Sequence, residues 1–327
     1  MMRQMFVAAL VLTSPLALAA QPAPTISQPV QGIHAVDSKT QAEDVKFKDD
    51  RSDRMTVPVR VSGAGPFRFL VDTGADRTSV SRELAGRLGL ASGESASIHT
   101  VTGESTVSTA VVPDLQLTRR PVNVSQAPML ESANIGADGI IGVDALRSQS
   151  VLFDFQTNTL SIVPSPSAEA HDTDPNVIVV QAQRKNGRLL FTDAVANGHT
   201  ITVVVDTGAQ VSIGNKALRE ELVGRGLVDP SQKVDLQSVT GALITGDYMF
   251  IRQLEIGGIT LKNLAIVFAD AHTFKELKLD KRPALLLGMN AIRAFKKVSI
   301  DFANSKFRVV LPESSALDVR LASAHLR

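Results

Sequence analysis

Two segments of the chain alternate apolar and polar positions as β-strands do, and both end in the same turn. The first covers residues 55–71 and is interrupted by a Gly- and Pro-bearing turn at 62–66; the second covers residues 191–205 and is interrupted by Asn197-Gly198. This period-two alternation predicts a β-hairpin in each segment, and Asn-Gly favours a tight hairpin turn. Each hairpin ends in the sequence Asp-Thr-Gly-Ala, which begins at Asp72 and again at Asp206.

A short helix is predicted after each of these turns, over residues 82–88 and 216–223. Leu84 and Leu88 lie four positions apart, as do Leu218 and Leu222. Side chains at that spacing share one helix face, so we expect both helices to pack on the body of the protein.

The similarity between the two halves continues downstream. Residues 100–103 (Thr-Val-Thr-Gly) match 238–241 (Ser-Val-Thr-Gly), 140–147 match 286–293, and 152–155 match 299–302. The order is kept while the separation grows from 134 to 146 residues, as small insertions would produce. Self-similarity of this extent predicts two homologous lobes, at 51–163 and 177–312, joined by a Pro- and Ser-rich linker at 164–176 and followed by a polar tail at 313–327.

The N-terminus reads as a secretory signal peptide over residues 1–19. Arg3 precedes a short apolar run, and Ala17-Leu18-Ala19 is the best cleavage site. The apolar run is shorter than the ~20 residues that a membrane span needs, so no stable membrane span is expected. We therefore expect an exported protein, periplasmic or secreted. Residues 20–50 are expected to be a flexible lead-in. The alternative is a pro-segment in which Lys46 and Lys48 cover the acidic active site.

Composition excludes several classes of function. The 327 residues include 34 basic and 33 acidic side chains, interspersed, with a formal net charge of +1, which is no footprint for binding nucleic acid. The chain has no cysteine, which rules out disulfides and thiolate chemistry and leaves the core to stabilise the fold.

The residues quoted above resemble the aspartic protease superfamily. The order is an apolar strand, Asp-Thr-Gly-Ala, a Gly-bearing hairpin about thirty residues later, and an apolar-apolar-Gly segment before a short helix. The sequence Asp72-Thr73-Gly74-Ala75-Asp76 is similar to the active-site motif of retropepsin-like (retroviral-type) proteases. The presence of two such units in one chain resembles the pepsin-type architecture instead. The resemblance covers about residues 55–163 and 186–311. It implies a mainly β fold of two acid-protease-type β-barrel lobes with short helices and an active site between them.

By this resemblance, Asp72 and Asp206 are the catalytic pair. One carboxylate takes a proton from water while one carboxylic acid gives a proton to the scissile carbonyl, and neither a metal nor a cofactor is required. Thr73 and Thr207 would exchange hydrogen bonds between the lobes. Support for the two active-site turns would come from Gly74, Ala75, Gly208 and Ala209, and Gly142 and Gly288 would let a buried strand pass behind each turn.

Two hairpins would cover the cleft as flaps, with tips at Thr102-Gly103 and Thr240-Gly241.

The alanines after each Asp-Thr-Gly replace the hydroxyl residue common in pepsin-type turns. Fewer donors to the ionised carboxylate should raise the pKa values of the pair, so activity is expected nearer neutral pH than in a gastric-type enzyme.

Other polar residues receive structural interpretations. Asp154 and Asp301 are expected to face outward from strands, although a site role is an alternative. His99, beside the first flap, is expected to be an exposed loop residue, with substrate contact as the alternative. The remaining histidines show no metal-ligand spacing. Tyr248 is expected to pack in a strand.

These observations predict an exported aspartic endopeptidase that acts as a monomer on extended peptide or protein substrates. One alternative is a binding protein that holds peptides in the same cleft without cutting them. Another is a pair of independent lobes that each associate with other chains. The copies diverge at Asp76, which is matched by Gln210, and the sequence assigns no role to this difference.

Overall fold

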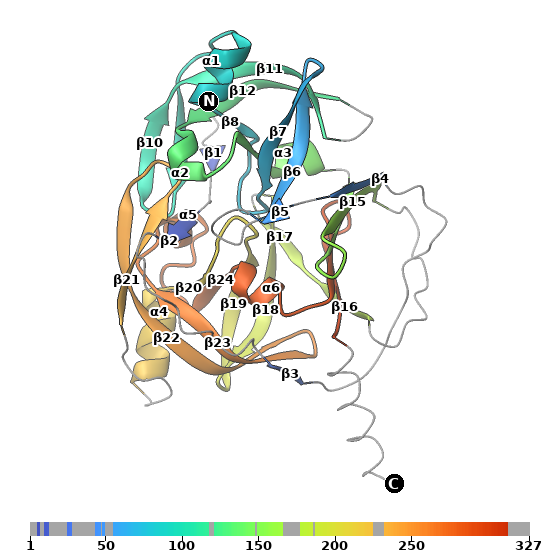
Figure 1. The fold of residues 1–327 in the computed structure, drawn as a ribbon. Coiled ribbons are helices and arrows are strands. Elements are labelled where there is room, and N and C mark those ends of the chain that lie inside the picture. The colour runs from blue at the N-terminus through green and yellow to red at the C-terminus, as the bar shows by residue number, and fades with distance from the viewer. Residues whose placement is uncertain are drawn as a thin grey trace.

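Two lobes rich in β-structure make up the described part of the chain in the computed structural model (Figure 1). The described residues are 55–117, 121–147, 149–165, 177–185, 187–224 and 232–312, with five short strands upstream: β1 Met5–Phe6, β2 Leu10–Leu12, β3 Thr25–Ser27, β4 Glu43–Lys46 and β5 Lys48–Asp49. Apart from these strands, the predicted signal peptide (1–19) and lead-in (20–50) lie outside the described residues. So do residues 166–176 of the predicted linker and the predicted tail (313–327).

The first lobe, blue to green in Figure 1, is a closed sheet with an added hairpin and three short helices. Its elements are β6 Met55–Val61, β7 Ala64–Val71, β8 Ser79–Ser81, α1 Arg82–Leu88, β9 Ala96–Thr100, β10 Gly103–Val107, β11 Thr109–Gln116, β12 Val122–Leu130, α2 Ser132–Ile135, β13 Gly139–Ile141 and α3 Val143–Leu146. The strands pair in the order β11-β12-β8-β13-β7-β6, and β11 pairs back with β6. Strands β9 and β10 form the first predicted flap hairpin.

The second lobe, yellow to red, repeats this arrangement. Its elements are β17 Gln183–Lys185, β18 Arg188–Ala196, β19 His199–Val205, β20 Ser212–Gly214, α4 Lys216–Val223, β21 Lys233–Ser238, β22 Leu243–Ile256, β23 Ile259–Phe268, α5 His272–Glu276, β24 Ala284–Leu287 and α6 Met289–Ile292. The order β18-β19-β24-β20-β23-β22 closes through pairing of β22 with β18. Strands β21 and β22 form the second predicted flap hairpin. The expectation of a mainly β fold with two barrel-like lobes is confirmed.

A third sheet joins the lobes. Its strands are β14 Gln149–Asp154, β15 Thr159–Pro164, β16 Val177–Gln181, β25 Lys297–Asp301 and β26 Lys306–Val310, with β4 at one edge. Strand β14 from the first half pairs antiparallel with β25 from the second, with Val151 opposite Ile300. Both side chains are fully buried, so the lobes share one hydrophobic core across this seam.

The predicted outward orientation of Asp154 and Asp301 is wrong. They are 7% and 0% exposed, respectively, in the sheet that joins the lobes. Lys297 Nζ lies 2.7 Å from Asp154 Oδ2, and Ser165 Oγ donates to Asp301 Oδ1 at 2.7 Å. Asp154 and Asp301 therefore recur in the two halves because each ends an equivalent strand, β14 or β25, where its carboxylate has a polar partner.

The predicted local elements are confirmed. Asn197 and Gly198 have φ values of 47° and 86°, the left-handed conformations that a two-residue hairpin turn requires. Helix α1 begins after Ser81, whose hydroxyl accepts from the Leu84 amide, and α4 begins after Asn215, whose side chain accepts from the Leu218 amide. Leu84, Leu218 and Leu222 are buried and Leu88 is partly buried against the core.

Tyr248 packs edge-on against Phe250 in β22. Within the described ranges, no helix has the length and apolar character needed to cross a bilayer.

Candidate active site

The two Asp-Thr-Gly turns have equivalent hydrogen bonds. Asp72 follows β7 and its amide donates to the carbonyl of Ile141 at 3.0 Å; Asp206 follows β19 and donates to Leu287 at 3.1 Å. The Asp72 carboxylate accepts from the Gly74 amide at 2.7 Å, and that of Asp206 accepts from the Gly208 amide at 3.0 Å. Each carboxylate is therefore held by the backbone of its own turn.

The carboxyl of Asp72 lies directly against the second turn. A Cβ atom built on Gly208 would fall 2.3 Å from Asp72 Cγ, so only glycine fits at 208 with Asp72 in this position. Asp72 is 0% and Asp206 1% exposed. Two residues that are 134 positions apart in the sequence are thus brought to one buried site.

Electrostatics at this site favour a shared proton. Burial raises the pKa of Asp206 well above its ordinary value, and the neighbouring Asp72 carboxylate raises it further. Arg188 and the amides of Gly208 and Ala209 oppose this rise. The direction agrees with the expectation drawn from Ala75 and Ala209, although the main cause is burial. Because the groups interact, their titration belongs to the pair.

Thr73 and Thr207 join the turns by reciprocal hydrogen bonds. The Thr73 amide donates to Thr207 Oγ1 at 3.0 Å, and the Thr207 amide donates to Thr73 Oγ1 at 3.0 Å. The Thr73 hydroxyl donates to the carbonyl of Val205 at 3.2 Å, and the Thr207 hydroxyl donates to that of Val71 at 2.8 Å. These are the interlobe bonds that the resemblance implies, and they fix the relative position of the turns.

Gly142 and Gly288 allow the backbone to pass close behind each turn. A Cβ on Gly142 would lie 2.5 Å from the carbonyl carbon of Arg77, and one on Gly288 would lie 2.6 Å from that of Val211. Behind this contact, Asp144 Oδ1 accepts from the Thr78 amide and hydroxyl at 2.8 and 2.7 Å. Asn290 Oδ1 accepts equivalently from Ser212 in the second lobe, at 2.8 and 2.9 Å.

Arg188 is a site residue that was not predicted from the sequence. It begins β18 in the second lobe, is 1% exposed, and donates to the carbonyl of Gly74 in the first. Its Nη1 lies 3.3 Å from Asp76 Oδ1. Burial raises the pKa of Asp76, Arg188 opposes the rise, and Asp144 adds to it. Asp76 therefore has an interlobe partner, which no local pattern in the sequence indicates.

The two predicted flap tips dock into opposite lobes. Val101 is buried in a cluster of the second lobe that includes Phe274, whereas Val239 is buried in a cluster of the first lobe that includes Ala75 and Ile98. Thr102 Oγ1 donates to Ser238 Oγ at 3.2 Å. Gly103 and Gly241 adopt φ values of 142° and 85°, which favour glycine, and Thr240 shares the second turn. Each hairpin tip is thus packed against the opposite lobe.

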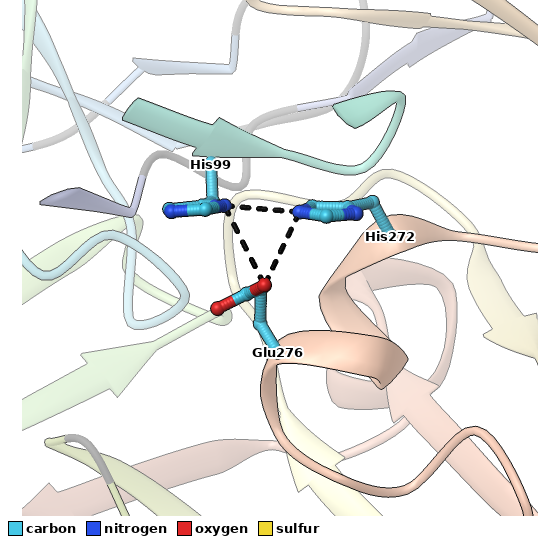
Figure 2. Close-up of side chains that lie close together, drawn as sticks. All are labelled: His99, His272 and Glu276. Atoms are coloured by element: carbon cyan, nitrogen blue, oxygen red, sulfur yellow. Dashed lines mark hydrogen bonds and ion pairs between the residues drawn. The ribbon is translucent and has the colours of Figure 1, made fainter. Parts of the chain in front are cut away.

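His99 is not an exposed loop residue, contrary to expectation. It lies in β9 and is 2% exposed. Figure 2 shows its ring beside that of His272, with Glu276 facing both; we call these three residues the histidine cluster. His99 Nδ1 lies 2.9 Å from His272 Nε2. His99 and His272 are 173 residues apart, so the spacing of the histidines in the sequence gives no sign of this cluster.

Two protein-family models match the chain, one on each lobe. A model of gag-polyprotein aspartyl proteases matches residues 57–148, and a second aspartyl protease model matches residues 192–291. A search of curated proteins finds no significant match. Each matched range contains one Asp-Thr-Gly turn, one flap hairpin and one of the glycines Gly142 and Gly288. The chain therefore belongs to the aspartic protease superfamily, with two retropepsin-like lobes in tandem.

Proposed function

We propose that the protein is an exported aspartic endopeptidase in which Asp72 and Asp206 together activate the attacking water. The observation that carries the proposal is the position of the Asp72 carboxyl against Gly208, in the turn that holds Asp206. Either carboxylate alone is only a buried acid. Together they supply a base and an acid at one place, because neighbouring like charges in a buried site do not both ionise readily.

The proposed reaction follows from that shared proton. The ionised carboxylate accepts a proton from water as the water oxygen attacks the scissile carbonyl carbon, and the protonated partner donates to the carbonyl oxygen. Collapse of the resulting gem-diol transfers a proton to the amide nitrogen as the C–N bond breaks. The amides of Gly74 and Gly208 hold the carboxylates in place throughout.

The proposed substrate class rests on the two flap hairpins, whose tips are packed against the opposite lobes. With Val101 and Val239 buried in opposite lobes, a peptide reaches the aspartates only after the hairpins lift. Hairpin edges pair best with an extended backbone, which favours unfolded or extended segments as substrates. One chain supplies both turns, so we expect the monomer to be active. Export rests on the predicted signal peptide.

The test compares cleavage by four purified proteins lacking residues 1–19. Wild type and Asp193→Asn, which removes an exposed acid in β18, should cleave a library of extended peptides at internal bonds. Asp72→Asn and Asp206→Asn should lose at least about 1000-fold in kcat/KM, on the order of the loss of an essential acid or base. Analytical ultracentrifugation of the active protein tests whether it is a monomer.

Cleavage by the Asp72→Asn variant at the wild-type rate would refute the shared site. If wild type binds peptides but cuts none, the protein is a binding module that uses the same cleft. Export is tested separately by N-terminal sequencing of protein recovered outside the cytoplasm.

A further inference from the structure

The histidine cluster brings three zinc-type ligand atoms to one point. His99 Nδ1 lies 2.9 Å from His272 Nε2 and 3.7 Å from Glu276 Oε1, and His272 Nε2 lies 3.4 Å from Glu276 Oε1. Bonds of 2.0–2.1 Å to a tetrahedral Zn²⁺ put ligand atoms about 3.3 Å apart. The Nδ1···Nε2 contact is a hydrogen bond between the rings, and it must open by about 0.4 Å for an ion to enter. Among the described residues this is the only group of three such ligands.

The cluster is buried on one side and open on the other. His99 is 2% exposed, whereas the side chains of His272 and Glu276 are 24% and 25% exposed. Solvent therefore reaches the cluster from the side of His272 and Glu276, and water could complete the coordination there. The carboxylate of Glu276 compensates part of the charge of a bound ion.

The equivalent contact in the other half of the molecule has no such ligands. Gln237 precedes Ser238-Val239 as His99 precedes Thr100-Val101, and Gln237 Nε2 donates to Asn134 Oδ1 in α2 at 3.0 Å. A neutral amide pair is thus enough to join a flap hairpin to the helix of the opposite lobe. The two imidazoles and the carboxylate exceed what that structural task requires.

We propose that the histidine cluster binds a Zn²⁺-class divalent metal ion, which clamps the first flap hairpin onto the second lobe. His99 belongs to β9 of the hairpin, and His272 and Glu276 are the first and last residues of α5 (Figure 2). The backbone already joins these elements, since the His272 amide donates to the carbonyl of Val101 at 2.8 Å. A bound ion resists the lifting that substrate entry requires. It therefore inhibits the peptidase, a consequence that rests on the proposed function.

Binding is tested directly with the tag-free full chain, in which β1 pairs with β9 beside His99. Calorimetry with ZnCl₂ should give one ion per chain, and Co²⁺ should give the visible absorption of a tetrahedral N/O site. The double variant His99→Gln/His272→Asn copies the Gln237–Asn134 pair and should weaken Zn²⁺ binding at least about 100-fold. His199→Gln is the matched control: His199 Nδ1 lies 3.1 Å from Glu221 but lies outside the histidine cluster, so Zn²⁺ binding should be unchanged.

The clamp is tested by amide hydrogen exchange of residues 98–103, which Zn²⁺ should slow in wild type but not in the double variant. Equal Zn²⁺ affinity in wild type and double variant would overturn the site. Unchanged exchange in the metal-bound wild type would overturn the clamp. If the double variant does not fold, His272→Asn alone replaces it, with the same expected loss of binding. None of these measurements depends on peptide cleavage. A further test of regulation is whether Zn²⁺ inhibits peptide cleavage by wild type but not by the double variant.

Discussion

Arg188 of the second lobe and Asp76 of the first form an ion pair at 3.3 Å, beside the turn that holds Asp72. Arg188 is almost completely buried and also donates to the carbonyl of Gly74. Since a buried cation costs much free energy without its counterion, this contact resists separation of the lobes near the aspartates.

Asp76→Asn should therefore lower the free energy of unfolding by roughly 3 kcal/mol, because it removes the carboxylate that forms an ion pair with the buried Arg188. Urea denaturation measures the change. Gln210 occupies the equivalent position in the second lobe, so Gln210→Asn is the matched control and should cost less than about 1 kcal/mol. Equal effects of the two substitutions would contradict an interlobe role for Asp76.

The reciprocal threonine bonds predict a second stability effect. Thr73→Val removes an acceptor from the Thr207 amide and a donor from the Val205 carbonyl, both in a buried environment. Leaving those groups unsatisfied should cost about 2–4 kcal/mol. Thr207→Val should behave in the same way, as thermal unfolding can measure.

Thr73→Ser keeps the hydroxyl and serves as the control. It should lose less than about 1.5 kcal/mol, the cost of one missing methyl group. A loss as large as that of Thr73→Val would mean that packing of the methyl group, rather than hydrogen bonding, explains the effect.

Gly208→Ala should inactivate the enzyme without unfolding it. The added methyl group would stand 2.3 Å from Asp72 Cγ and must displace that carboxyl. We expect a stability cost of about 1–3 kcal/mol and loss of measurable peptide cleavage. Gly86→Ala in α1 is the control, because its added Cβ would meet no atom within 4 Å. It should raise stability by about 0.5–1 kcal/mol and leave cleavage intact.

The raised pKa of Asp206 predicts a definite dependence of stability on pH. The folded state keeps a proton that the unfolded chain releases above pH ~3.9, so this contribution to stability is complete at low pH. It is lost as pH rises through the folded-state pKa, at up to about 1.4 kcal/mol per pH unit. Asp206→Asn stays neutral, so its stability relative to wild type should increase as pH rises above the ordinary Asp value of about 3.9. A difference independent of pH would contradict the raised pKa.

The same direction of shift predicts the working range of the enzyme. The active pair carries one proton, and burial makes the loss of that proton harder. Activity should thus persist to a pH well above the ordinary Asp value of about 3.9. A pH–rate profile that falls to zero at or below that value would refute this expectation.

The repeated turns, hairpins and glycines could be predicted from the sequence because each depends on local pattern. Period-two alternation before Asp72 and Asp206 specified the hairpins, and Asn197-Gly198 specified a turn. The duplication then implied that the two aspartates meet. Cross-lobe hydrogen bonds between Thr73 and Thr207 followed from the resemblance.

Contacts between distant segments could not be predicted in this way. The orientation of Asp154 depends on Lys297 in the partner strand of the other half, which its own alternation does not reveal. His99 and His272 are 173 residues apart, and Arg188 meets Asp76 across the lobe interface. In each case the partner is chosen by tertiary packing, and a single sequence contains no local pattern that records it.

Joining the halves in one chain, through the paired strands β14 and β25, frees each half from having the same sequence as the other. Identical subunits related by a two-fold axis must present the same wall to both sides of a bound peptide. In this chain the halves have diverged at matched positions: Asp76 against Gln210, and His99 against Gln237. The two lobes are consequently not chemically equivalent, as identical subunits would be.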